Sequence, residues 1–362
     1  MDKVSPYDLK KPRTRVIFVK EQYLSYGGQN RKFPQPVRNN KGSQMEDTLE
    51  VKSTKEPGGV GWISNLQDFV VHDGPGLRVL LFLRGCPLRC RWCQNPENLD
   101  LSPQIEYHQS RCIGCLRCME VCPIPGAIVE DAEQRIDRSK CNNCMACADV
   151  CLGKALEKVG QQMSVQEAVK KIMAYRPFFD HSDRGGVTLS GGDPILQPEF
   201  TLGLLKALRE QGIHTTVETS GYTSYEALKK IVENADLIIY DIKHMDEDRH
   251  VAGTGRSNLI ILENLRRLCD EVDTEIAVHV PLIPAFNDNE ENIKSTADFV
   301  RSLQKIKHID LLPFNELASE KYAALGLDWE YADTQRQSPE HLDRLKDIVE
   351  SYGLEVTIGG LW

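Results

Sequence analysis

The sequence predicts an α/β fold built on a parallel sheet, either an open doubly wound sheet or a barrel. Short apolar runs alternate with amphipathic helical patterns over the second half of the chain, which implies parallel strands with right-handed crossovers. A length of 362 residues with 41% hydrophobic residues suits one large core plus a smaller domain. Polar residues directly follow several of the apolar runs. In both architectures, functional residues gather at these carboxyl ends of the strands.

The first expected strand is a continuous apolar run that leads straight to a cysteine. The expected strands are Arg78–Arg84, Val187–Ser190, His214–Thr219, Asp236–Lys243, Glu275–Pro284, His308–Phe314 and Glu355–Ile358. Helical patterns between them are Pro198–Gln211, Ser224–Asn234 and Asn292–Gln304.

Residues 1–58 differ from the rest of the chain. They hold 12 Lys or Arg against 7 Asp or Glu, with scattered Pro and Gly and little periodicity. This pattern predicts a flexible, mildly basic extension, with a partner-binding tail as the alternative. Met45 is an alternative start of the protein.

Charge and hydropathy limit the classes of partner that the protein is expected to bind. A net charge of −9 gives no reason to expect nucleic-acid binding. No apolar run approaches the length of a membrane span, and the N-terminus lacks the apolar core of a secretory signal. The expected location is therefore the cytoplasm, with no membrane partner.

Twelve cysteines are the most informative part of the composition, and eleven lie between Cys86 and Cys151. A disulfide framework fits small secreted domains rather than a chain with this much core. Cys269 stands alone in a helical pattern, where it is interpreted as a small buried hydrophobic residue.

Cys86, Cys90 and Cys93 have the spacing C-x3-C-x2-C directly after the first strand. Three thiolates in one loop can bind three irons of a [4Fe–4S] cube and leave the fourth iron open to a substrate. The alternative is a zinc site, but zinc favours paired C-x2-C units with four ligands in total.

A second pattern is an internal repeat with the spacing of two-cluster ferredoxins. In such proteins the fourth cysteine of each run serves the other cluster. The predicted ligands of one cluster are Cys112, Cys115, Cys118 and Cys151, and those of the other are Cys141, Cys144, Cys147 and Cys122. Eight structural zinc ligands are the alternative.

These motifs carry a family resemblance. The stretches Asp73–Arg78 (DGPGLR) and Arg84–Glu97 (RGCPLRCRWCQNPE) resemble the glycyl-radical-enzyme activating enzymes of the radical SAM superfamily, and the similarity runs from about residue 60 to the end. The resemblance implies a partial (β/α) parallel-sheet barrel formed by residues 59–101 and 159–362. One subset of the family carries a bacterial-ferredoxin-like insert with two clusters, here residues 102–158.

The resemblance also implies which residues bind S-adenosylmethionine (SAM). Backbone groups of Trp92, Cys93 and Gln94 are expected to meet the adenine. Further implied contacts lie at the ends of later strands, at Gly191, Gly192, Asp193, Glu218, Asp241, Ile242 and Lys243.

Within this set, Asp193 replaces the commoner Glu, which would leave part of the contact to the glycine carbonyl groups. The acidic pair Glu218 and Asp241 can also hold a monovalent cation. Lys243 is assigned a catalytic role beside the SAM carboxylate.

Three further positions complete the predicted site. His279 lies where some relatives carry an active-site arginine, and a core histidine is the equal alternative. Asn315 lies where relatives often carry a histidine that contacts SAM. Asp73 is predicted to contact the glycine loop of a partner enzyme, with an ordinary turn aspartate as the alternative.

The activity implied is reductive cleavage of SAM, followed by abstraction of a hydrogen atom from a backbone glycine of a glycyl radical enzyme. Three [4Fe–4S] clusters and a low-potential donor such as flavodoxin or ferredoxin are expected. Two rivals are a radical SAM enzyme with auxiliary clusters that acts on a peptide or small molecule, and a simple electron carrier. Radical SAM enzymes with auxiliary clusters usually carry their additional cysteines after the barrel. In this sequence, Cys269 is the only cysteine after Cys151.

Overall fold

The computed structural model describes residues 59–130 and 133–360. The predicted extension over residues 1–58, with Met45 as its alternative start, lies outside the described residues. Within the described ranges, no helix is both long enough and apolar enough to cross a membrane.

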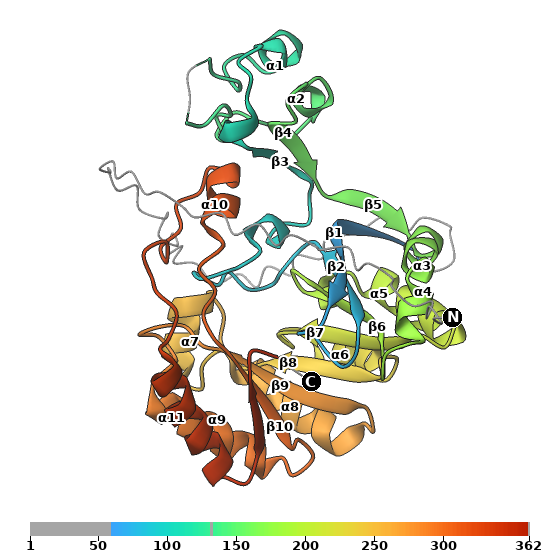
Figure 1. The fold of residues 1–362 in the computed structure, drawn as a ribbon, viewed down its shortest axis with the longest axis vertical. Coiled ribbons are helices and arrows are strands. Elements are labelled where there is room, and N and C mark those ends of the chain that lie inside the picture. The colour runs from blue at the N-terminus through green and yellow to red at the C-terminus, as the bar shows by residue number, and fades with distance from the viewer. Residues whose placement is uncertain (1–58, 131–132, 361–362) are drawn as a thin grey trace, which may run out of the picture. The chain divides into compact units, whose positions relative to one another are not determined.

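A nine-stranded sheet forms the body of the molecule (Figure 1). Its strand order is β11-β10-β9-β8-β7-β6-β2-β1-β5. Neighbouring strands pair in parallel among β2, β6, β7, β8, β9, β10 and β11. At the β2 side of the sheet, β1 and β5 add an antiparallel edge. Their bounds are β1 Val60–Val70, β2 Arg78–Leu83, β5 Gln161–Ser164, β6 Gly186–Gly191, β7 His214–Thr219, β8 Leu237–Asp241, β9 Glu275–Pro281, β10 His308–Leu312 and β11 Glu355–Ile358.

The expected α/β class and parallel order are confirmed, and three strand ends are corrected. β8, β9 and β10 each end two or three residues earlier than predicted. β8 ends at Asp241, although the Ile242 amide still donates to the His279 carbonyl at 2.9 Å. The antiparallel edge strands β1 and β5 were not predicted.

Helices connect the parallel strands, and most of them begin at a residue suited to the N-cap. Ser164 forms a capping box with Glu167, and Asp246, Asn289 and Ser338 cap later helices. The helices are α1 Arg117–Val121, α2 Ala146–Asp149, α3 Val165–Met173, α4 Arg176–Phe179, α5 Pro198–Glu210, α6 Tyr225–Val232, α7 Glu247–Thr254, α8 Leu259–Glu271, α9 Glu290–Ser302, α10 Ser319–Leu325 and α11 Pro339–Ser351.

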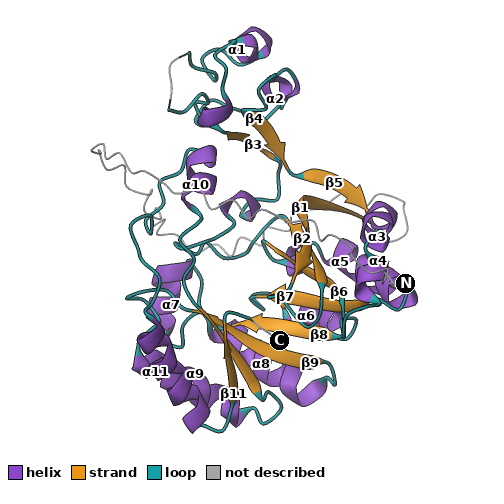
Figure 2. Ribbon diagram, in the orientation of Figure 1, coloured by secondary structure: helices purple, strands orange, loops and turns teal. Residues whose placement is uncertain are grey.

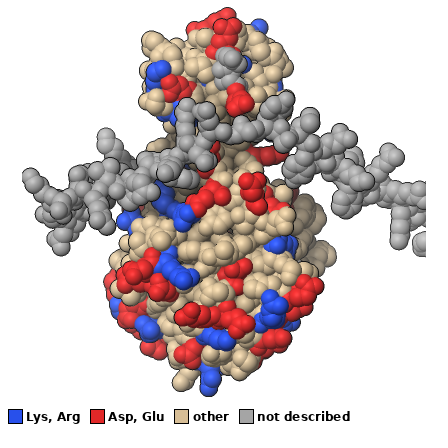
Figure 3. Space-filling model, turned by 90° about the vertical axis from the view of Figure 1, so that its left-hand side faces the viewer, with Lys and Arg blue, Asp and Glu red and all other residues tan. Residues whose placement is uncertain are grey.

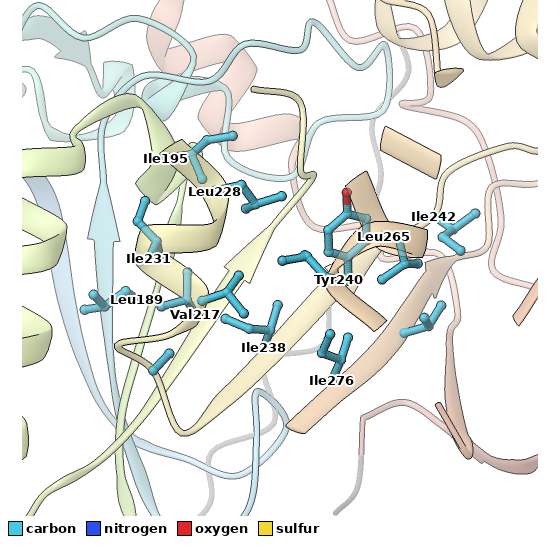
Figure 4. Close-up of a cluster of buried hydrophobic side chains, with 14 of the residues drawn as sticks. Leu189, Ile195, Val217, Leu228, Ile231, Ile238, Tyr240, Ile242, Leu265 and Ile276 are labelled. Atoms are coloured by element: carbon cyan, nitrogen blue, oxygen red, sulfur yellow. The ribbon is translucent and has the colours of Figure 1, made fainter. Parts of the chain in front are cut away.

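Alternation along the strands separates an apolar outer face from a polar inner face. Leu189, Val217, Ile238 and Ile276 point outward and pack with residues of the covering helices such as Leu228 (Figure 4). The inner face instead carries buried polar groups, including Arg78, Thr188, Thr216, His279 and Asp310. The hydrophobic core therefore lies between the sheet and its helices, and the inner face can carry functional side chains.

The cysteine-rich segment lies between β3 (Gln104–Tyr107) and β4 (Leu156–Val159), which pair in antiparallel fashion. Most of this segment is loop, with the short helices α1 and α2 and a 3-10 helix over Gln109–Arg111 (Figure 2). Charged side chains of both signs are mixed over the face of the molecule drawn in Figure 3.

Arg78 is fully buried and anchors the Asp73–Gly76 turn to the sheet. Its guanidinium donates to the carbonyls of Pro75 (2.8 Å) and Val187 (2.7 Å). It also donates to the Thr188 hydroxyl at 2.7 Å, and that hydroxyl donates to the Asp73 carbonyl at 2.6 Å. One buried side chain thus fixes the turn that carries Asp73.

Replacing Arg78 with Met should lower the free energy of unfolding by about 3 kcal/mol or more, because several buried acceptors would lose their donor. Urea unfolding of the apo-protein measures this change. The control is Arg209→Met, because Arg209 is exposed and makes one hydrogen bond of 3.3 Å to Glu233. Equal stability of the two variants would contradict this role for Arg78.

Candidate active site

A cavity of about 850 Å³, part of it open to solvent, lies at the carboxyl ends of β2, β6, β7 and β8. It brings together most of the residues predicted for the site. The predicted residues that line it are Cys86, Cys90, Trp92, Cys93, Gln94, Gly191, Gly192, Asp193, Glu218, Asp241 and Lys243.

Four other predicted residues do not line this cavity. Ile242 belongs to the apolar core, and His279 and Asp73 lie deeper along the inner face. Asn315 is exposed, and its side-chain oxygen accepts from the Leu317 amide at 3.0 Å. The geometry therefore gives Asn315 no contact with the cavity wall.

Backbone hydrogen bonds hold the cysteine loop on both sides. The amides of Gly85 and Cys86 donate to Asn98 (2.8 Å) and Leu99 (3.1 Å). Those of Arg89 and Arg91 donate to the carbonyls of Thr254 (2.8 Å) and Gly253 (3.0 Å), at the end of α7. The loop is thus positioned by its backbone, which leaves its thiols available to a ligand.

The three thiols of this loop fit an iron–sulfur cluster. Each is free of disulfide bonding and lines the cavity. Burial raises the pKa of Cys86, Cys90 and Cys93 to about 12 in the protein alone. Buried thiols of this kind ionise only when a metal supplies positive charge, and three of them can ligate three irons of a cubane.

Gly191 and Gly192 are required by packing against the cysteine loop. A Cβ atom on Gly191 would lie 2.5 Å from the Leu83 backbone, and one on Gly192 would lie 2.2 Å from the Gly85 carbonyl oxygen. The Gly192 amide donates to Leu83 at 2.7 Å, and the Asp193 amide donates to Gly85 at 2.8 Å. The two glycines therefore join the end of β6 to the loop.

The Asp193 carboxylate is buried and engaged by its neighbours. It accepts from the Thr219 hydroxyl (2.8 Å), the Ser220 amide (2.9 Å) and the Ser220 hydroxyl (2.6 Å). It also accepts from the Ile195 amide at 3.3 Å. These bonds tie the end of β6 to the turn after β7.

Carboxylates and one lysine meet at the ends of β7 and β8. Lys243 Nζ lies 2.8 Å from Asp241 Oδ2, and the Ser190 hydroxyl donates to Glu218. Burial, together with the charges of Asp241 and Asp73, raises the pKa of Glu218 to about 7. Burial alone would lower the pKa of Lys243, but the charge of Asp241 and its hydrogen bond to Lys243 raise it.

His279 forms part of a buried charge network that the sequence analysis did not predict. Its Nε2 lies 3.2 Å from Asp310 Oδ2, and Asp310 Oδ1 lies 3.1 Å from His308 Nε2. His279 Nδ1 lies 3.9 Å from Glu218 Oε1. Burial opposes the imidazolium, yet the interaction with Asp310 and the charge of Glu218 raise the pKa of His279. The inward alternation of Asp310 within its strand was the available signal.

The first four predicted ligands of the insert line one cavity. Cys112, Cys115, Cys118 and Cys151 line one small pocket that is partly open to solvent. Arg135 Nη2 lies 3.5 Å from Cys112 Sγ, and the amides of Ala155 and Leu156 lie 3.2 and 3.3 Å from Cys151 Sγ.

The second set gathers around Cys147. Burial, together with the neighbouring thiols of Cys141, Cys118, Cys122 and Cys144, raises the pKa of the Cys147 thiol to about 11. Cys147 is buried, whereas Cys144 is exposed.

Both runs share their backbone conformation. Gly114 and Asn143 have φ values of 70° and 55°, and Leu116 and Met145 have φ values of 56° and 70° at the next matching position. The internal repeat in sequence is therefore also a repeat in structure.

Helix α10 connects the insert to the cysteine loop, a contact that sequence reasoning missed. On one side, Arg138 Nη2 donates to the Ala324 carbonyl at 2.9 Å. On the other, Lys321 Nζ donates to Asn95 (2.6 Å) and Glu97 (3.0 Å), just after Cys93. Tyr322 packs in the aromatic cluster around Trp92 and Cys90.

The family model "Radical SAM superfamily" matches residues 80–300. Trans-4-hydroxy-L-proline dehydratase activating enzyme of Clostridioides difficile is 40% identical over 82% of this chain and 99% of its own length.

Two further relatives have names of the same kind. (2S)-3-sulfopropanediol dehydratase activating enzyme of Klebsiella oxytoca is 40% identical over 83% of this chain and 97% of its own. Isethionate sulfite-lyase activating enzyme of Nitratidesulfovibrio vulgaris is 42% identical over 79% and 94%. The chain therefore belongs to the radical SAM superfamily and, within it, to the activating enzymes of glycyl radical enzymes.

Proposed function

We propose that this enzyme activates a partner glycyl radical enzyme, by reductive cleavage of SAM and removal of a hydrogen atom from a backbone glycine of the partner. The observation that carries the proposal is one cavity lined by the three free thiols and by the charged residues at the ends of β6, β7 and β8. Relatives with this activity in their names match along almost their whole length.

Cys86, Cys90 and Cys93 would hold the [4Fe–4S] cluster, and the cavity beside them would hold SAM. When bound, the cluster supplies one electron to SAM, which gives methionine and a 5′-deoxyadenosyl radical that takes up the glycine hydrogen atom. The chain orients the reactants and excludes water.

The residues around the cavity have separate roles in this proposal. Lys243 would pair with the carboxylate of SAM, and the backbone of Trp92, Cys93 and Gln94 would meet its adenine. Carboxylate oxygens of Glu218 and Asp241 lie within 4.8 Å of each other, which supports a monovalent cation there.

Asp73 is the proposed contact for the glycine loop of the partner. Burial raises its pKa, the charge of His279 lowers it, and the charge of Asp241 raises it. Its backbone carbonyl accepts from the Thr188 hydroxyl, which holds the residue beside the inner face of the sheet. A position of this kind suits a hydrogen-bond acceptor for a peptide segment that enters the barrel.

The insert, over residues 102–158 between barrel segments 59–101 and 159–362, would bind two further [4Fe–4S] clusters. The cavity shared by Cys112, Cys115, Cys118 and Cys151 supports one of them, and the thiols around Cys147 support the other. Such clusters can pass on strongly reducing electrons from a carrier such as flavodoxin or ferredoxin. The cytoplasm, which keeps thiols reduced, is the proposed compartment.

Replacing Cys90 with Ala should abolish the activity by removing a ligand of the open-site cluster. We expect no 5′-deoxyadenosine with dithionite and a loss of about four iron atoms per chain. The control is Cys269→Ala, because Cys269 lies on α8 in the hydrophobic core. Activity at the wild-type level in the Cys90 variant would contradict the proposal.

The partner can be tested with two purified glycyl radical enzymes, trans-4-hydroxy-L-proline dehydratase and isethionate sulfite-lyase. An EPR signal from a glycyl radical should appear on at least one of them and be absent with the Cys90 variant. If SAM is cleaved but neither partner acquires the radical, the rival reading as an enzyme that acts on a peptide or small molecule gains support.

Crossed ligation in the insert predicts a contrast between two double variants. Cys115→Ala with Cys151→Ala changes two ligands of the same cluster, so about four iron atoms per chain should be lost. Cys115→Ala with Cys122→Ala changes both clusters, so the loss should be about eight. The opposite order in iron analysis and Mössbauer spectra would mean that each run ligates its own cluster.

Replacing Asp193 with Ala should destabilise the protein even without SAM. Three donors of Thr219 and Ser220 would lose their acceptor, which costs about 2–4 kcal/mol of unfolding free energy. The control, Asp180→Ala, removes an exposed carboxylate 3.5 Å from Arg176 and should cost less than about 0.5 kcal/mol. Normal stability with lost SAM affinity would instead make Asp193 a direct contact to SAM.

A further inference from the structure

One loop of the insert holds helix α10 through hydrogen bonds. The Gln134 side-chain amide donates to the Ala323 carbonyl, and Arg138 Nη2 donates to the Ala324 carbonyl at 2.9 Å. Arg138 Nη1 donates to the carbonyl of Ile105 in β3. The Arg138 guanidinium therefore joins the insert to α10, and it does so just before the second cysteine run begins.

The second set of insert thiols consists of Cys122, Cys141, Cys144 and Cys147, and two of its members act on Arg138. Cys147 is buried in one hydrophobic cluster with Ile105, the residue whose carbonyl binds Arg138. Burial lowers the pKa of Arg138, whereas the charges of Cys141, Glu106 and Cys147 raise it. Arg138 thus has the second set on one side and α10 on the other.

On its other side, α10 reaches the cysteine loop through Tyr322. This residue packs in the aromatic cluster that contains Trp92 and Cys90. Burial, together with the charges of Cys93 and Cys90, raises the pKa of Tyr322. Tyr322 precedes Ala324 by two residues, so less than one helical turn separates the contact with the loop from the contact with the insert.

In the described part of the chain, no such bridge leads to α10 from the first set of insert thiols, Cys112, Cys115, Cys118 and Cys151. The arginine beside that set is Arg135, whose Nη2 lies 3.5 Å from Cys112 Sγ and whose Nη1 donates to the Val129 carbonyl at 3.1 Å. Burial lowers the pKa of His108, just before this set, and the charge of Glu320 on α10 opposes the shift. Among the described residues, however, no hydrogen bond or ion pair joins His108 to α10.

We propose that Arg138 and α10 form the electron route from the second set of thiols to the cysteine loop, so that the cluster on the second set is the direct donor to the loop cluster. The proposal rests on the proposed function, which puts [4Fe–4S] clusters on these cysteines. One electron leaves the insert cluster, which is oxidised by one unit, and reduces the loop cluster by one unit. A carrier such as flavodoxin then restores the electron to the insert. Tunnelling weakens steeply with distance and is favoured through covalent and hydrogen bonds, which Arg138 and α10 supply.

Pulsed EPR of the dithionite-reduced holoprotein tests the order of the clusters without catalysis. A nearby reduced cluster speeds the spin relaxation of the loop cluster, and this effect falls steeply with distance. Cys141→Ala with Cys144→Ala, which removes the second cluster, should slow that relaxation severalfold. The matched control, Cys112→Ala with Cys115→Ala, removes the first cluster and should leave the relaxation close to the wild-type rate. Iron analysis confirms the loss of about four iron atoms per chain in each variant.

Freeze-quench EPR during reduction by flavodoxin hydroquinone tests the route itself. Arg138→Met should slow reduction of the loop cluster at least tenfold and leave reduction of the insert clusters at the wild-type rate. The control is Arg111→Met, because Arg111 is exposed and pairs with Glu157 inside the insert at 2.7 Å. Iron content should match the wild type in both variants. If Arg138→Met loses iron, Arg138→Lys takes its place, since lysine keeps the charge but lacks the fork that binds two carbonyls.

Two results would overturn the proposal. One is a larger loss of relaxation when the first cluster is removed than when the second is removed. The other is a wild-type rate of loop-cluster reduction in the Arg138 variant. A wild-type enzyme that forms no 5′-deoxyadenosine with dithionite would instead count against the proposed function, because dithionite needs no route through the insert.

Discussion

The close approach of the cysteine loop to the end of β6 is the constraint on which the site depends. At Gly192 the two backbones are so near that only glycine fits, and Gly85 accepts a hydrogen bond from the next residue. Asp193 then carries the connection to Ser220 after β7. Three segments far apart in sequence are thereby fixed around one cavity, so the thiols and the charged strand ends keep a common geometry before any cofactor binds.

Two other features extend from this centre. Along the inner face of the sheet, Asp310 and Glu218 surround His279, so that buried charge is balanced within the protein. Toward the insert, α10 contacts both Arg138 and the residues just after Cys93. A change in the insert can therefore reach the cysteine loop through one short helix, which gives the proposed electron carriers a physical link to the site.

Periodicity and spacing were sufficient for the fold and for much of the site. β7 and β11 have the predicted bounds, and two of the three predicted cysteine groups line cavities, whereas Cys122, Cys141, Cys144 and Cys147 line neither of them. Polar strand ends were harder, because Lys243 continues the pattern of its strand although β8 ends at Asp241. The alternation within its strand could have placed Asp310 on the inner face, but its pairing with His279 depends on strand register, and the contacts of α10 depend on tertiary packing. Asn315 was expected in the site but is exposed.

The central claim is that one iron of the cluster bound by Cys86, Cys90 and Cys93 is free to bind SAM. EPR of the dithionite-reduced, fully reconstituted protein, recorded with and without SAM, tests this claim most directly. The account predicts that SAM shifts the signal of one cluster and leaves the signals of the insert unchanged. A spectrum that is identical with and without saturating SAM would contradict it.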